Sequence, residues 1–576
     1  MPKTTQNALA ETMKKLLEQN PFFAKLEKDQ AEVIAENLLA PFMSVSVPGT
    51  GSFRAWQDQW LAWQKDMTAL WLSTALGSVP SEAPKDRRFK AEPWEKGIFP
   101  FLRESYMLTA RTMADMADGA NLPRHEQRKL SFYARLAADA LAPSNYVMTN
   151  PEVLDRAKDT NGQSLVDGFK NLMDDLQKGY ISTTDETAFK VGENLATSPG
   201  AVVFRNELIE VIQYEPATKN VKAQPVLIVP PCVNKFYIFD LNERKSMIRY
   251  LVGEGVPVFT ISWRNPSGSV QDLGWDEYLQ DGIFAALKVA SEIAGNAKVD
   301  LLSWCNGGTM LVAALAVIPE ELKAKVGTAT FLSSLVDFSD PGDLEVFIDR
   351  PQLMSYRQRM EISDVAPGRD IARAMALLHA NESVWNFVIG NYLMGKTPAP
   401  FDILYWNADT SNLPKRWFLT FTEDMYEKNL LKEPGALSML GQPVDTRNIE
   451  VPCYFLSATE DHIVPWKSSF DATQHLGRNT TFVLTDGGHV SGTVINHPTG
   501  SRRHYHVDGD VSGEAADWLD SATRHDGSWW THWLEWRDSH ATGADKPAPK
   551  KLGSAKHKPL DAAPGTYVLE NVRQDG

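Results

Sequence analysis

Three residues that are far apart in the chain have the side chains that nucleophilic acyl transfer needs. Cys305 lies between a strand-like run and an apolar helical run, Asp461 follows a later strand-like run, and His489 stands in a glycine-rich turn after the next run. An imidazole that is oriented by a carboxylate can activate a thiol for attack on an acyl carbonyl. The chain order nucleophile, acid, histidine is typical of one kind of α/β enzyme. We therefore predict Cys305, Asp461 and His489 as catalytic residues.

Cys305 has the surroundings of a nucleophile elbow, which is a sharp, strained turn between a strand and a helix. The turn needs small residues two positions before and two positions after the nucleophile, and Ser303 and Gly307 occupy these positions. Glycine is usual at the first of them, and we expect the turn to survive this departure because serine is also small. The alternative interpretation is a buried structural cysteine at a tight turn, since buried cysteine is common.

A thiol in place of the usual serine has a chemical consequence. Free cysteine has a pKa of about 8.5, and a neighbouring imidazole can generate the thiolate at neutral pH. When a thiolate attacks an acyl thioester, the product is another thioester of similar energy, so the acyl group stays activated. The cysteine therefore favours a transferase over a hydrolase.

Other acidic and imidazole side chains near the predicted site compete for the same roles. Glu460 and His462 flank Asp461, and Asp486 stands close to His489 in the sequence. Asp461 is preferred because it directly precedes a His-Ile-Val-Pro turn and has the expected offset before the histidine. Its position after a strand also places it at the carboxyl end of a parallel sheet, where α/β proteins hold their chemistry.

A tetrahedral intermediate needs two backbone N–H donors. The amide of Asn306, directly after the nucleophile, is the first candidate. The second should come from the loop after an early strand, where prolines 230–231 stiffen the chain and donate no N–H, so we choose Val233. Cys232 in this loop could be mistaken for a second catalytic thiol, but we favour a packing role, and we place Cys453 in the core.

Strand-like runs and helical stripes alternate in the second part of the chain. A helical stripe that ends at Gly295 lies between two of these runs, which makes a βαβ unit. Such alternation predicts a mostly parallel sheet that is covered on both faces. The strand-like runs are 201–203, 225–230, 257–263, 299–304, 452–458 and 481–485.

We expect a helical N-terminal domain over residues 1–185 and an α/β catalytic domain over 186–576. The βαβ rhythm stops between about 340 and 450, which we interpret as an inserted cap, and 546–565 should form a tail along the surface. In the first domain, apolar residues at helical spacing indicate packing within the domain or a surface for a partner or an apolar phase. These residues are Leu9, Met13, Leu16, Leu17, Trp56, Trp60, Trp63 and Leu70.

The composition excludes several classes of protein. The 576 residues carry a net charge of −15, which opposes binding to nucleic acid. Three scattered cysteines suit neither a disulfide framework nor a multi-cysteine metal site, and we expect a reducing compartment. We expect no secretory signal and no transmembrane segment, because the apolar runs are shorter than the roughly 18–20 residues that span a bilayer.

Several motifs in order along the chain resemble the polyhydroxyalkanoate synthases, and in particular the single-subunit class I enzymes. The resemblance covers nearly the whole chain. Besides the Cys305 elbow, it is carried by Asp86-Arg87-Arg88-Phe89 with Trp94, Thr149-Asn150-Pro151-Glu152, the stretch from Pro230 to Tyr237, Ser262-Trp263-Arg264-Asn265-Pro266, the stretch from Asp461 to Trp466, and Gly527-Ser528-Trp529-Trp530.

The resemblance implies an α/β-hydrolase fold and a polymerase that takes (R)-3-hydroxyacyl-CoA, releases CoA and extends a polyester. In the family the elbow cysteine carries the acyl chain, the histidine activates it, and the aspartate is thought to assist the attacking 3-hydroxyl. Cys305, His489 and Asp461 match these positions. Whether Asp461 orients His489 or activates the hydroxyl stays open, as does the preferred acyl length, for which short chains are the class-level expectation. No cofactor or metal is expected, since the CoA thioester is the substrate.

The resemblance also implies a place and partners for the protein. Family members work as homodimers at the surface of cytoplasmic polyester granules, and their N-terminal region is associated with granule attachment, dimer stability and granule proteins. The cap would cover the cysteine and open for substrate. The alternatives are a cysteine-dependent α/β-hydrolase that cleaves esters or thioesters, and a granule scaffold without activity.

Overall fold

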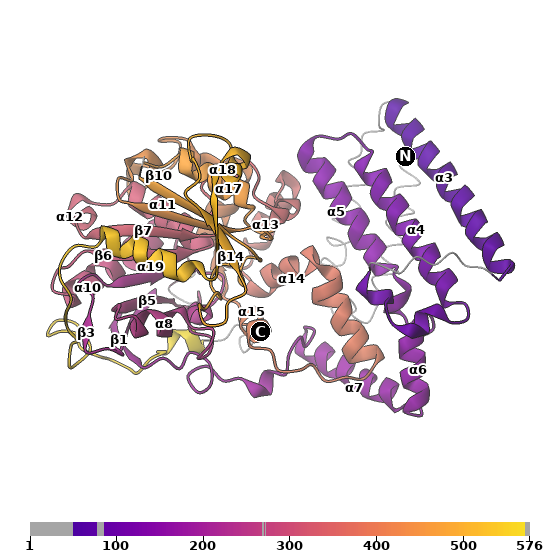
Figure 1. The fold of residues 1–576 in the computed structure, drawn as a ribbon, viewed down its shortest axis with the longest axis horizontal. Coiled ribbons are helices and arrows are strands. Elements are labelled where there is room, and N and C mark those ends of the chain that lie inside the picture. Colours follow the sequence, from indigo (N-terminus) through magenta and orange to yellow (C-terminus); the bar gives the residue numbers. More distant parts are fainter. Residues whose placement is uncertain (1–49, 78–85, 268–269, 271, 478, 571–576) are drawn as a thin grey trace. The chain divides into compact units, whose positions relative to one another are not determined.

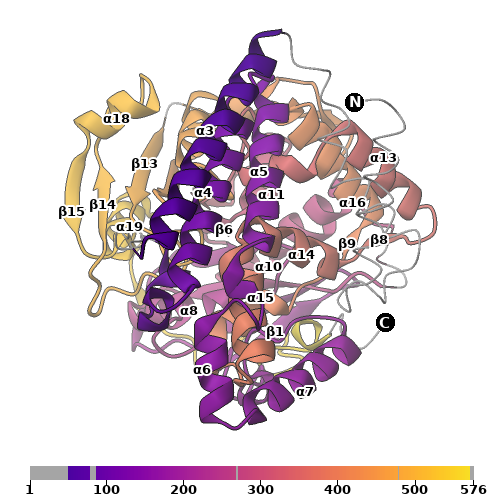
Figure 2. The ribbon, with the colours of Figure 1, turned by 90° about the vertical axis from the view of Figure 1, so that its right-hand side faces the viewer.

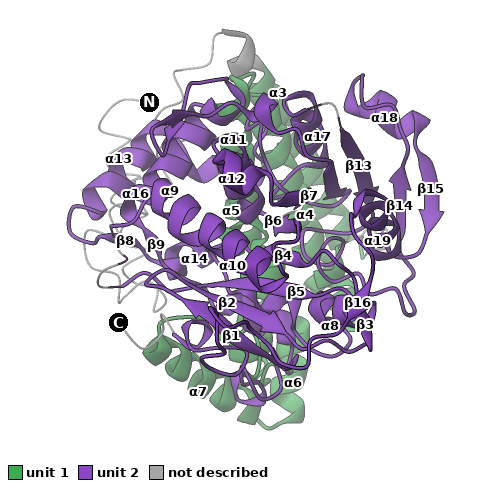
Figure 3. Cartoon of the chain, turned by 90° about the vertical axis from the view of Figure 1, so that its left-hand side faces the viewer, with its two compact units in different colours: residues 1–185, 375–399 green, residues 186–374, 400–576 purple. Residues whose placement is uncertain are grey.

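The computed structural model describes residues 50–77, 86–267, 270, 272–477 and 479–570. The chain forms two compact units (Figure 3). The first contains the described residues up to Asp185 together with Met375–Ala399, and the second contains Glu186–Ala374 and the described residues from Pro400 onward. The division at residue 185 coincides with the expected domain boundary. Residues 375–399, which we expected in the cap of the catalytic domain, belong instead to the helical unit.

The first unit is helical. Helices α3 (Thr50–Ala75), α4 (Phe99–Asp118) and α5 (Arg124–Ala140) lie side by side (Figures 1 and 2). Helices α6 (Pro151–Asp159) and α7 (Gln163–Lys178) follow. Short 3₁₀ turns connect these helices, namely η1 (Arg87–Phe89), η2 (Glu92–Glu95) and η3 (Pro143–Asn145).

The tryptophan stripe of α3 packs within the helical unit through part of its residues. The indole N–H of Trp56 donates to the Met116 carbonyl at 2.8 Å, and that of Trp63 donates to the Thr109 hydroxyl at 3.2 Å. Trp60 stacks on Trp63 with 4.8 Å between ring centroids but is 49% exposed. Trp56 and Trp63 therefore bind α4, whereas the indole of Trp60 lies largely on the surface. The predicted stripe from Leu9 to Leu17 lies outside the described residues.

Residues 375–399 join the helical unit because they pack closely on α7. This segment contains the π-helical turns η9 (Asn381–Trp385) and η10 (Val388–Leu393), and the hydroxyl of Tyr392 in η10 donates to Asp175 at 2.6 Å. A Cβ atom at Gly168 of α7 would lie 1.9 Å from the Tyr392 carbonyl oxygen, so only glycine permits this approach. No sequence spacing could indicate a contact between segments so far apart in the chain.

The second unit is built on one large sheet (Figure 1). Its order is β1-β2-β5-β4-β6-β7-β12-β13-β14-β15 within the described residues. The bounds are β1 (Gly200–Arg205), β2 (Ile209–Tyr214), β4 (Val226–Val229), β5 (Val258–Trp263), β6 (Val299–Trp304), β7 (Val326–Leu332), β12 (Cys453–Ala458), β13 (Thr480–Thr485), β14 (His504–Val507) and β15 (Thr523–Asp526).

The central strands from β5 to β13 pair in parallel, and the outer strands at both edges pair antiparallel. This confirms the predicted mostly parallel sheet. The six expected strand-like runs correspond to β1, β4, β5, β6, β12 and β13, whereas β2, β7, β14 and β15 of this sheet were not predicted. Parallel strands with a common direction end at one edge of the sheet, and the chemistry is expected there.

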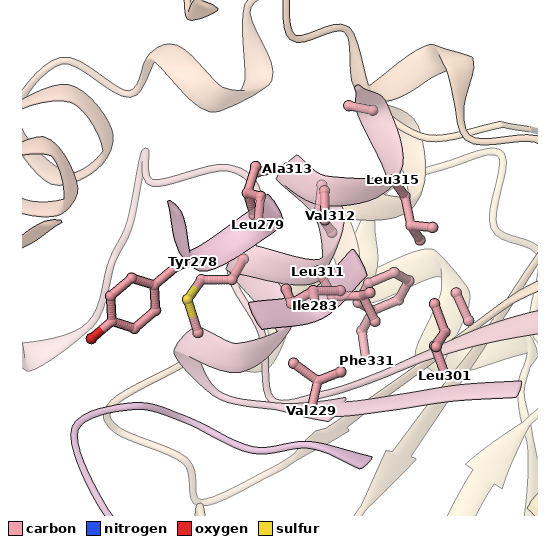
Figure 4. Packing of buried hydrophobic residues seen from close by; sticks show 14 of the residues in the cluster. Val229, Tyr278, Leu279, Ile283, Leu301, Leu311, Val312, Ala313, Leu315 and Phe331 are labelled. Atoms are coloured by element: carbon pink, nitrogen blue, oxygen red, sulfur yellow. The ribbon is translucent and has the colours of Figure 1, made fainter. Parts of the chain in front are cut away.

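Both faces of the sheet are covered, because neighbouring apolar residues point to opposite sides. Leu301 of β6 packs with α10 (Ala285–Ile293) and α11 (Asn306–Ala316), together with Phe331 and Leu311 (Figure 4). The next residue, Leu302, belongs to the cluster on the other face, which includes residues of α8 (Met247–Gly253) and α19 (Trp529–His540). Fully apolar strands therefore suit a sheet with helices on both faces.

The remaining helices of this unit are short and connect or flank the strands. They are η4 (Glu186–Ala188), η5 (Phe236–Phe239), α9 (Trp275–Glu277), η7 (Tyr278–Phe284), α12 (Glu320–Lys323), α17 (Trp466–Asp471), η14 (Ala472–Gln474), α18 (Ala515–Ser521) and η15 (Tyr567–Leu569). Among the residues that the structure describes, none of the helices combines the length and apolar character needed to cross a membrane.

The stretch between β7 and β12 interrupts the alternation of strands and helices, as expected for an insertion. It contains two small antiparallel pairs, β8 with β9 and β10 with β11. Its elements are η8 (Asp343–Phe347), α13 (Arg350–Arg359), β8 (Val365–Ala366), α14 (Gly368–Leu378), α15 (Asp402–Ala408), β9 (Leu413–Pro414), α16 (Lys415–Leu419), η11 (Thr420–Glu427), η12 (Leu430–Lys432), β10 (Ser438–Met439), β11 (Gln442–Pro443) and η13 (Thr446–Asn448), besides η9 and η10.

The tail after α19 runs along the edge of the sheet. β16 (Lys546–Pro547) pairs with β3 (Asn220–Val221), and the chain then follows β1. The Leu560 amide donates to the Val202 carbonyl at 2.8 Å, and the Ala563 amide donates to the Gly200 carbonyl at 2.9 Å. These bonds protect the exposed edge of β1.

Candidate active site

Cys305 occupies the sharp corner between β6 and α11. Its φ of 54° and ψ of −132° are unusual for a residue with a side chain. The corner is fastened on both sides, because the Cys305 amide donates to the Leu332 carbonyl at 2.9 Å and the Cys305 carbonyl accepts from the Gly308 amide at 2.9 Å. The side chain of Cys305 is partly exposed. The structure therefore has the elbow geometry that the sequence predicted.

The small residues around Cys305 are required by close contacts. A Cβ atom at Gly307 would lie 2.6 Å from the Val229 carbonyl oxygen, so the helix can approach the end of β4 only with glycine there. Ser303, in the place usual for glycine, is fully buried, and its hydroxyl donates to the Thr330 carbonyl at 2.8 Å. The departure from glycine is tolerated because this hydroxyl is satisfied by the neighbouring strand.

His489 and Asp461 are brought together by the pairing of β12 and β13. These parallel strands end side by side, and the loops that follow carry Asp461 and His489. The Nδ1 atom of His489 lies 2.7 Å from Oδ2 of Asp461. The other carboxylate oxygen accepts the amides of Ile463 at 3.0 Å and Val464 at 2.9 Å. Both oxygens of Asp461 are therefore engaged, and its side chain is fully buried.

The charges of this cluster favour a protonated imidazole. Burial by itself lowers the pKa of His489, but the Asp461 carboxylate and the Cys305 side chain, to which His489 is also hydrogen-bonded, raise it to about 10. Burial raises the pKa of Asp461, and the charge and hydrogen bond of His489 outweigh this, so that the pKa is lowered. Cys305, His489 and Asp461 thus form a linked series of polar groups.

The competing acidic and imidazole residues take other positions. The side chain of Glu460 is exposed. Asp486 accepts the His504 amide at 3.1 Å and lies 3.7 Å from the Arg503 guanidinium, so its carboxylate serves β14 and its preceding loop. The His462 carbonyl accepts the Asp343 amide at 3.0 Å. Of the four candidates for the role of acid or base partner, Asp461 is the one bonded to His489.

The two predicted oxyanion donors are the backbone amides of Val233 and Asn306, and neither is used in another hydrogen bond among the described residues. The Cys232 amide, by contrast, donates to the Asn306 side-chain oxygen at 3.2 Å. Val233 is therefore a better donor candidate than its neighbour.

Cys232 and Cys453 are packing residues. Cys232 is 2% exposed and belongs to the large core cluster, and burial raises the pKa of its thiol well above the usual range. Cys453 in β12 is 1% exposed, and burial raises its pKa to about 12. Neither thiol is easily ionised, which agrees with the packing roles predicted for both.

Two aromatic residues beside the triad were not singled out from the sequence. The centroid of the Trp304 ring lies 4.9 Å from the centroid of the His489 ring. Burial raises the pKa of the Tyr426 phenol in the insertion, and the charge of the nearby Cys305 raises it further. Trp304 could have been suspected because it precedes the nucleophile, whereas nothing in the sequence relates Tyr426 to Cys305. Among the described residues, no group of three His, Cys, Asp or Glu side chains is arranged to hold a metal ion.

Two family models match the chain. One, described as the N-terminus of poly-beta-hydroxybutyrate polymerase (PhaC), matches residues 85–251. The other, described as the alpha/beta hydrolase fold, matches residues 225–492 and so includes all three predicted catalytic residues.

Several poly(3-hydroxyalkanoate) polymerases are similar to the chain over most of their length. The chain is 39% identical over 513 residues to the poly(3-hydroxyalkanoate) polymerase subunit PhaC of Cupriavidus necator, covering 88% of this chain and 87% of that protein. It is 37% identical to poly(3-hydroxyalkanoate) polymerase 2 of Ectopseudomonas oleovorans, with 86% and 88% covered. It is 36% identical to the poly(3-hydroxyalkanoate) polymerase of Methylorubrum extorquens, with 88% and 85% covered.

Proposed function

Because the chain belongs to the family of poly(3-hydroxyalkanoate) polymerases, we propose that it polymerises (R)-3-hydroxyacyl-CoA into polyhydroxyalkanoate and releases CoA. The observation that carries this proposal is a thiol at a strained elbow, hydrogen-bonded to an imidazole whose other nitrogen lies 2.7 Å from a buried carboxylate. Short-chain monomers such as 3-hydroxybutyryl-CoA are the proposed substrates. No cofactor is needed in this scheme, since the thioester is already activated.

The first step transfers the acyl group to Cys305. The thiolate attacks the thioester carbonyl, and the resulting oxyanion accepts hydrogen bonds from the amides of Asn306 and Val233. The bond between the carbonyl carbon and the CoA sulfur then breaks, and His489, protonated as its raised pKa favours, gives its proton to the leaving CoA thiolate. The product is an acyl thioester on Cys305 with a neutral imidazole beside it.

The second step extends the polyester. The 3-hydroxyl oxygen of another hydroxyacyl unit attacks the thioester on Cys305, an ester C–O bond forms, and the C–S bond to Cys305 breaks. His489 accepts the hydroxyl proton, which restores the imidazolium beside the thiolate. We propose that Asp461 orients His489 and favours its protonated form, and that Asp461 does not itself activate the hydroxyl. This is supported by its burial and by the engagement of both its oxygens with His489 and with backbone amides.

The proposed setting is the surface of cytoplasmic polyester granules, where the protein would act as a homodimer together with granule-associated proteins. Helix α3 supports this part of the proposal, because several large apolar side chains on it are exposed. They are Trp60, Leu61, Trp71 and Leu72. Exposed apolar groups of this size favour contact with a protein partner or an apolar surface.

The proposed reaction is tested with 3-hydroxybutyryl-CoA as substrate. CoA release, followed with a thiol reagent, should be accompanied by insoluble polymer. Release of CoA with free 3-hydroxybutyrate and no polymer would instead support a hydrolase, and no release would support a scaffold. A series of acyl-CoA lengths in the same assay measures the chain-length preference.

The oxyanion role of Asn306 is tested by removing its amide hydrogen. Asn306 is the first residue of α11, a position at which proline is tolerated in a helix. Asn306→Pro should lower the rate of CoA release by roughly 10²- to 10³-fold, the usual effect of losing one oxyanion donor. The matched control is Asn306→Ala, which removes the same side chain but keeps the amide and should lose much less activity. Equal losses in both variants would assign the effect to the side chain.

A further inference from the structure

Lys235 is a buried cation on the loop that carries Val233. The residue is 7% exposed and follows β4 by a few positions. Its ammonium lies 2.9 Å from Oδ1 of Asp409 and donates to the carbonyl oxygens of Val568 at 2.7 Å and Glu570 at 2.6 Å. The two carbonyl oxygens accept hydrogen bonds from the ammonium, and the Asp409 carboxylate balances its charge as an ion pair. Lys235 is therefore held by groups of this chain on the side of the loop that faces the insertion and the segment 568–570.

The same loop is joined to the insertion by its backbone. The Ser411 amide donates to the Val233 carbonyl at 3.0 Å, and the Trp406 indole donates to the Lys235 carbonyl at 2.8 Å. Asp409 lies between these two residues, and its second oxygen accepts the Tyr237 hydroxyl at 2.9 Å. Residues of the insertion on both sides of Asp409 thus donate hydrogen bonds to backbone carbonyl groups of the loop.

The segment that supplies the two carbonyl groups is itself anchored to the sheet. Glu210 of β2 is fully buried and accepts the amides of Thr566 at 3.0 Å and Tyr567 at 3.1 Å. The Arg264 guanidinium lies 3.2 Å from the Glu570 carboxylate. This segment is anchored to β2 and to the residue after β5, so the two carbonyl groups that bind the Lys235 ammonium have a defined position.

Charge explains why these contacts matter. Placing an ammonium in the interior is costly unless it is paired and fully hydrogen-bonded, so Lys235 holds its three partners together. These partners come from the insertion and from the segment after Thr566, which are far apart in the sequence. These contacts fix the loop between β4 and η5 relative to the insertion and to the segment after Thr566.

We infer that Lys235 is a positioning residue, which holds the Val233 amide in place by tying its loop to Asp409 and to the carbonyl groups of Val568 and Glu570. The inference rests on the proposed function in one respect, namely that the Val233 amide receives the oxyanion. A shift of about 1 Å in such a donor is enough to lower a rate substantially. Lys235 would then act on the formation of the tetrahedral intermediate and not on the ionisation of Cys305.

The test compares two reactions of Cys305 in a Lys235→Met variant of the full chain. Alkylation by iodoacetamide needs the thiolate but forms no oxyanion, whereas CoA release from 3-hydroxybutyryl-CoA needs both. We expect the rate of CoA release to fall roughly 10- to 100-fold with little change in KM. The rate of Cys305 alkylation should stay within about twofold of the parent, because the triad is untouched. Lys190→Met, which changes an exposed lysine, is the matched control and should leave both rates unchanged.

Two results would overturn the inference. If CoA release by Lys235→Met stays near the parental rate, the contacts of Lys235 do not position the oxyanion donor. If CoA release and alkylation fall together, Lys235 supports the triad or the fold as a whole. All rates are taken well below the melting temperature of each variant, which is measured alongside.

Asp409→Asn keeps the test decisive if Lys235→Met does not fold. This change keeps the shape of the side chain but removes its charge, and it should lower CoA release about 3- to 10-fold with alkylation unchanged. Where all variants fold, the losses in the double variant should be smaller than the product of the single losses, because the two residues act through one contact. A hydrolase forms the same oxyanion. A parent protein that releases CoA without polymer would therefore refute the proposed polymerisation and leave the test of Lys235 valid.

Discussion

Replacing Cys305 by alanine should abolish CoA release and polymer formation, with a loss of roughly 10⁵-fold or to below detection. The reason is that the acyl group has no other thiol to which it can move. Cys232 and Cys453 are buried, and burial raises the pKa of both. The measurement is CoA release under single-turnover conditions, combined with mass spectrometry of the peptide that contains Cys305. In the parent protein this peptide should gain the mass of the acyl group.

Cys453→Ala is the control for the loss of a thiol as such. It removes a core cysteine in β12, so it should lower the melting temperature slightly and keep activity within about threefold of the parent. Unchanged CoA release by Cys305→Ala would exclude Cys305 as the nucleophile. An acyl group found on a peptide other than that of Cys305 would lead to the same conclusion.

Replacing Asp461 by asparagine should lower the rate of CoA release by roughly 10⁴-fold. The asparagine oxygen can still accept the amides of Ile463 and Val464, which keeps the loop in place. Its NH₂ group would then face Nδ1 of His489 and could only donate to it, which forces the proton onto the wrong nitrogen of the imidazole. The thiol of Cys305 would lose the acceptor of its proton.

The pH dependence of alkylation provides a second signature of the same change. In the parent, the Asp461 carboxylate helps to raise the pKa of His489 to about 10, so the imidazolium that pairs with the thiolate persists through neutral pH. Without that carboxylate the pKa of His489 falls. The imidazolium is then lost at lower pH than in the parent, and iodoacetamide should alkylate Cys305 much more slowly at pH 7. The rate should recover only as hydroxide removes the thiol proton at higher pH.

These two measurements also decide which role Asp461 has. If Asp461 orients His489, alkylation and the first release of CoA fall together. If Asp461 chiefly activates the 3-hydroxyl, both stay close to the parental rates, and chain extension alone is lost. Asp486→Asn is the matched control, because this carboxylate binds the His504 amide, and activity should remain within about threefold of the parent.

Much of the fold could be predicted because buried parallel strands have a clear sequence pattern. β4 and β6 are apolar runs, and the structure has them where they were expected. β2 was missed because it contains Glu210 and Gln213, which are buried in spite of their polarity. Glu210 is stabilised there by Arg205 and by amides of the segment after residue 565, and a local pattern cannot reveal such distant partners.

The site shows the same division between local and distant information. The elbow at Cys305 could be predicted because a strand, a small-residue turn and a helix follow one another directly in the chain. The choice of Asp461 over Asp486 was based on its place after a strand, the turn that follows it and its offset before the histidine, and the structure adds the bond to His489. Tyr426 and Lys235 were not predicted as parts of the site, since their neighbours come from other segments.

The sequence alone was sufficient to predict the kind of chemistry, because residue types, their order and the strand-turn-helix pattern are local properties of the chain. It also determined the class of sheet, since burial on both faces requires continuous apolar strands. Three features could be established only from the folded chain, namely which carboxylate reaches His489, which loop amides are left without a partner among the described residues, and the packing of residues 375–399 with the helical unit. These features depend on contacts between segments that are distant in the chain. Such contacts form only in the folded protein, so no local sequence pattern indicates them.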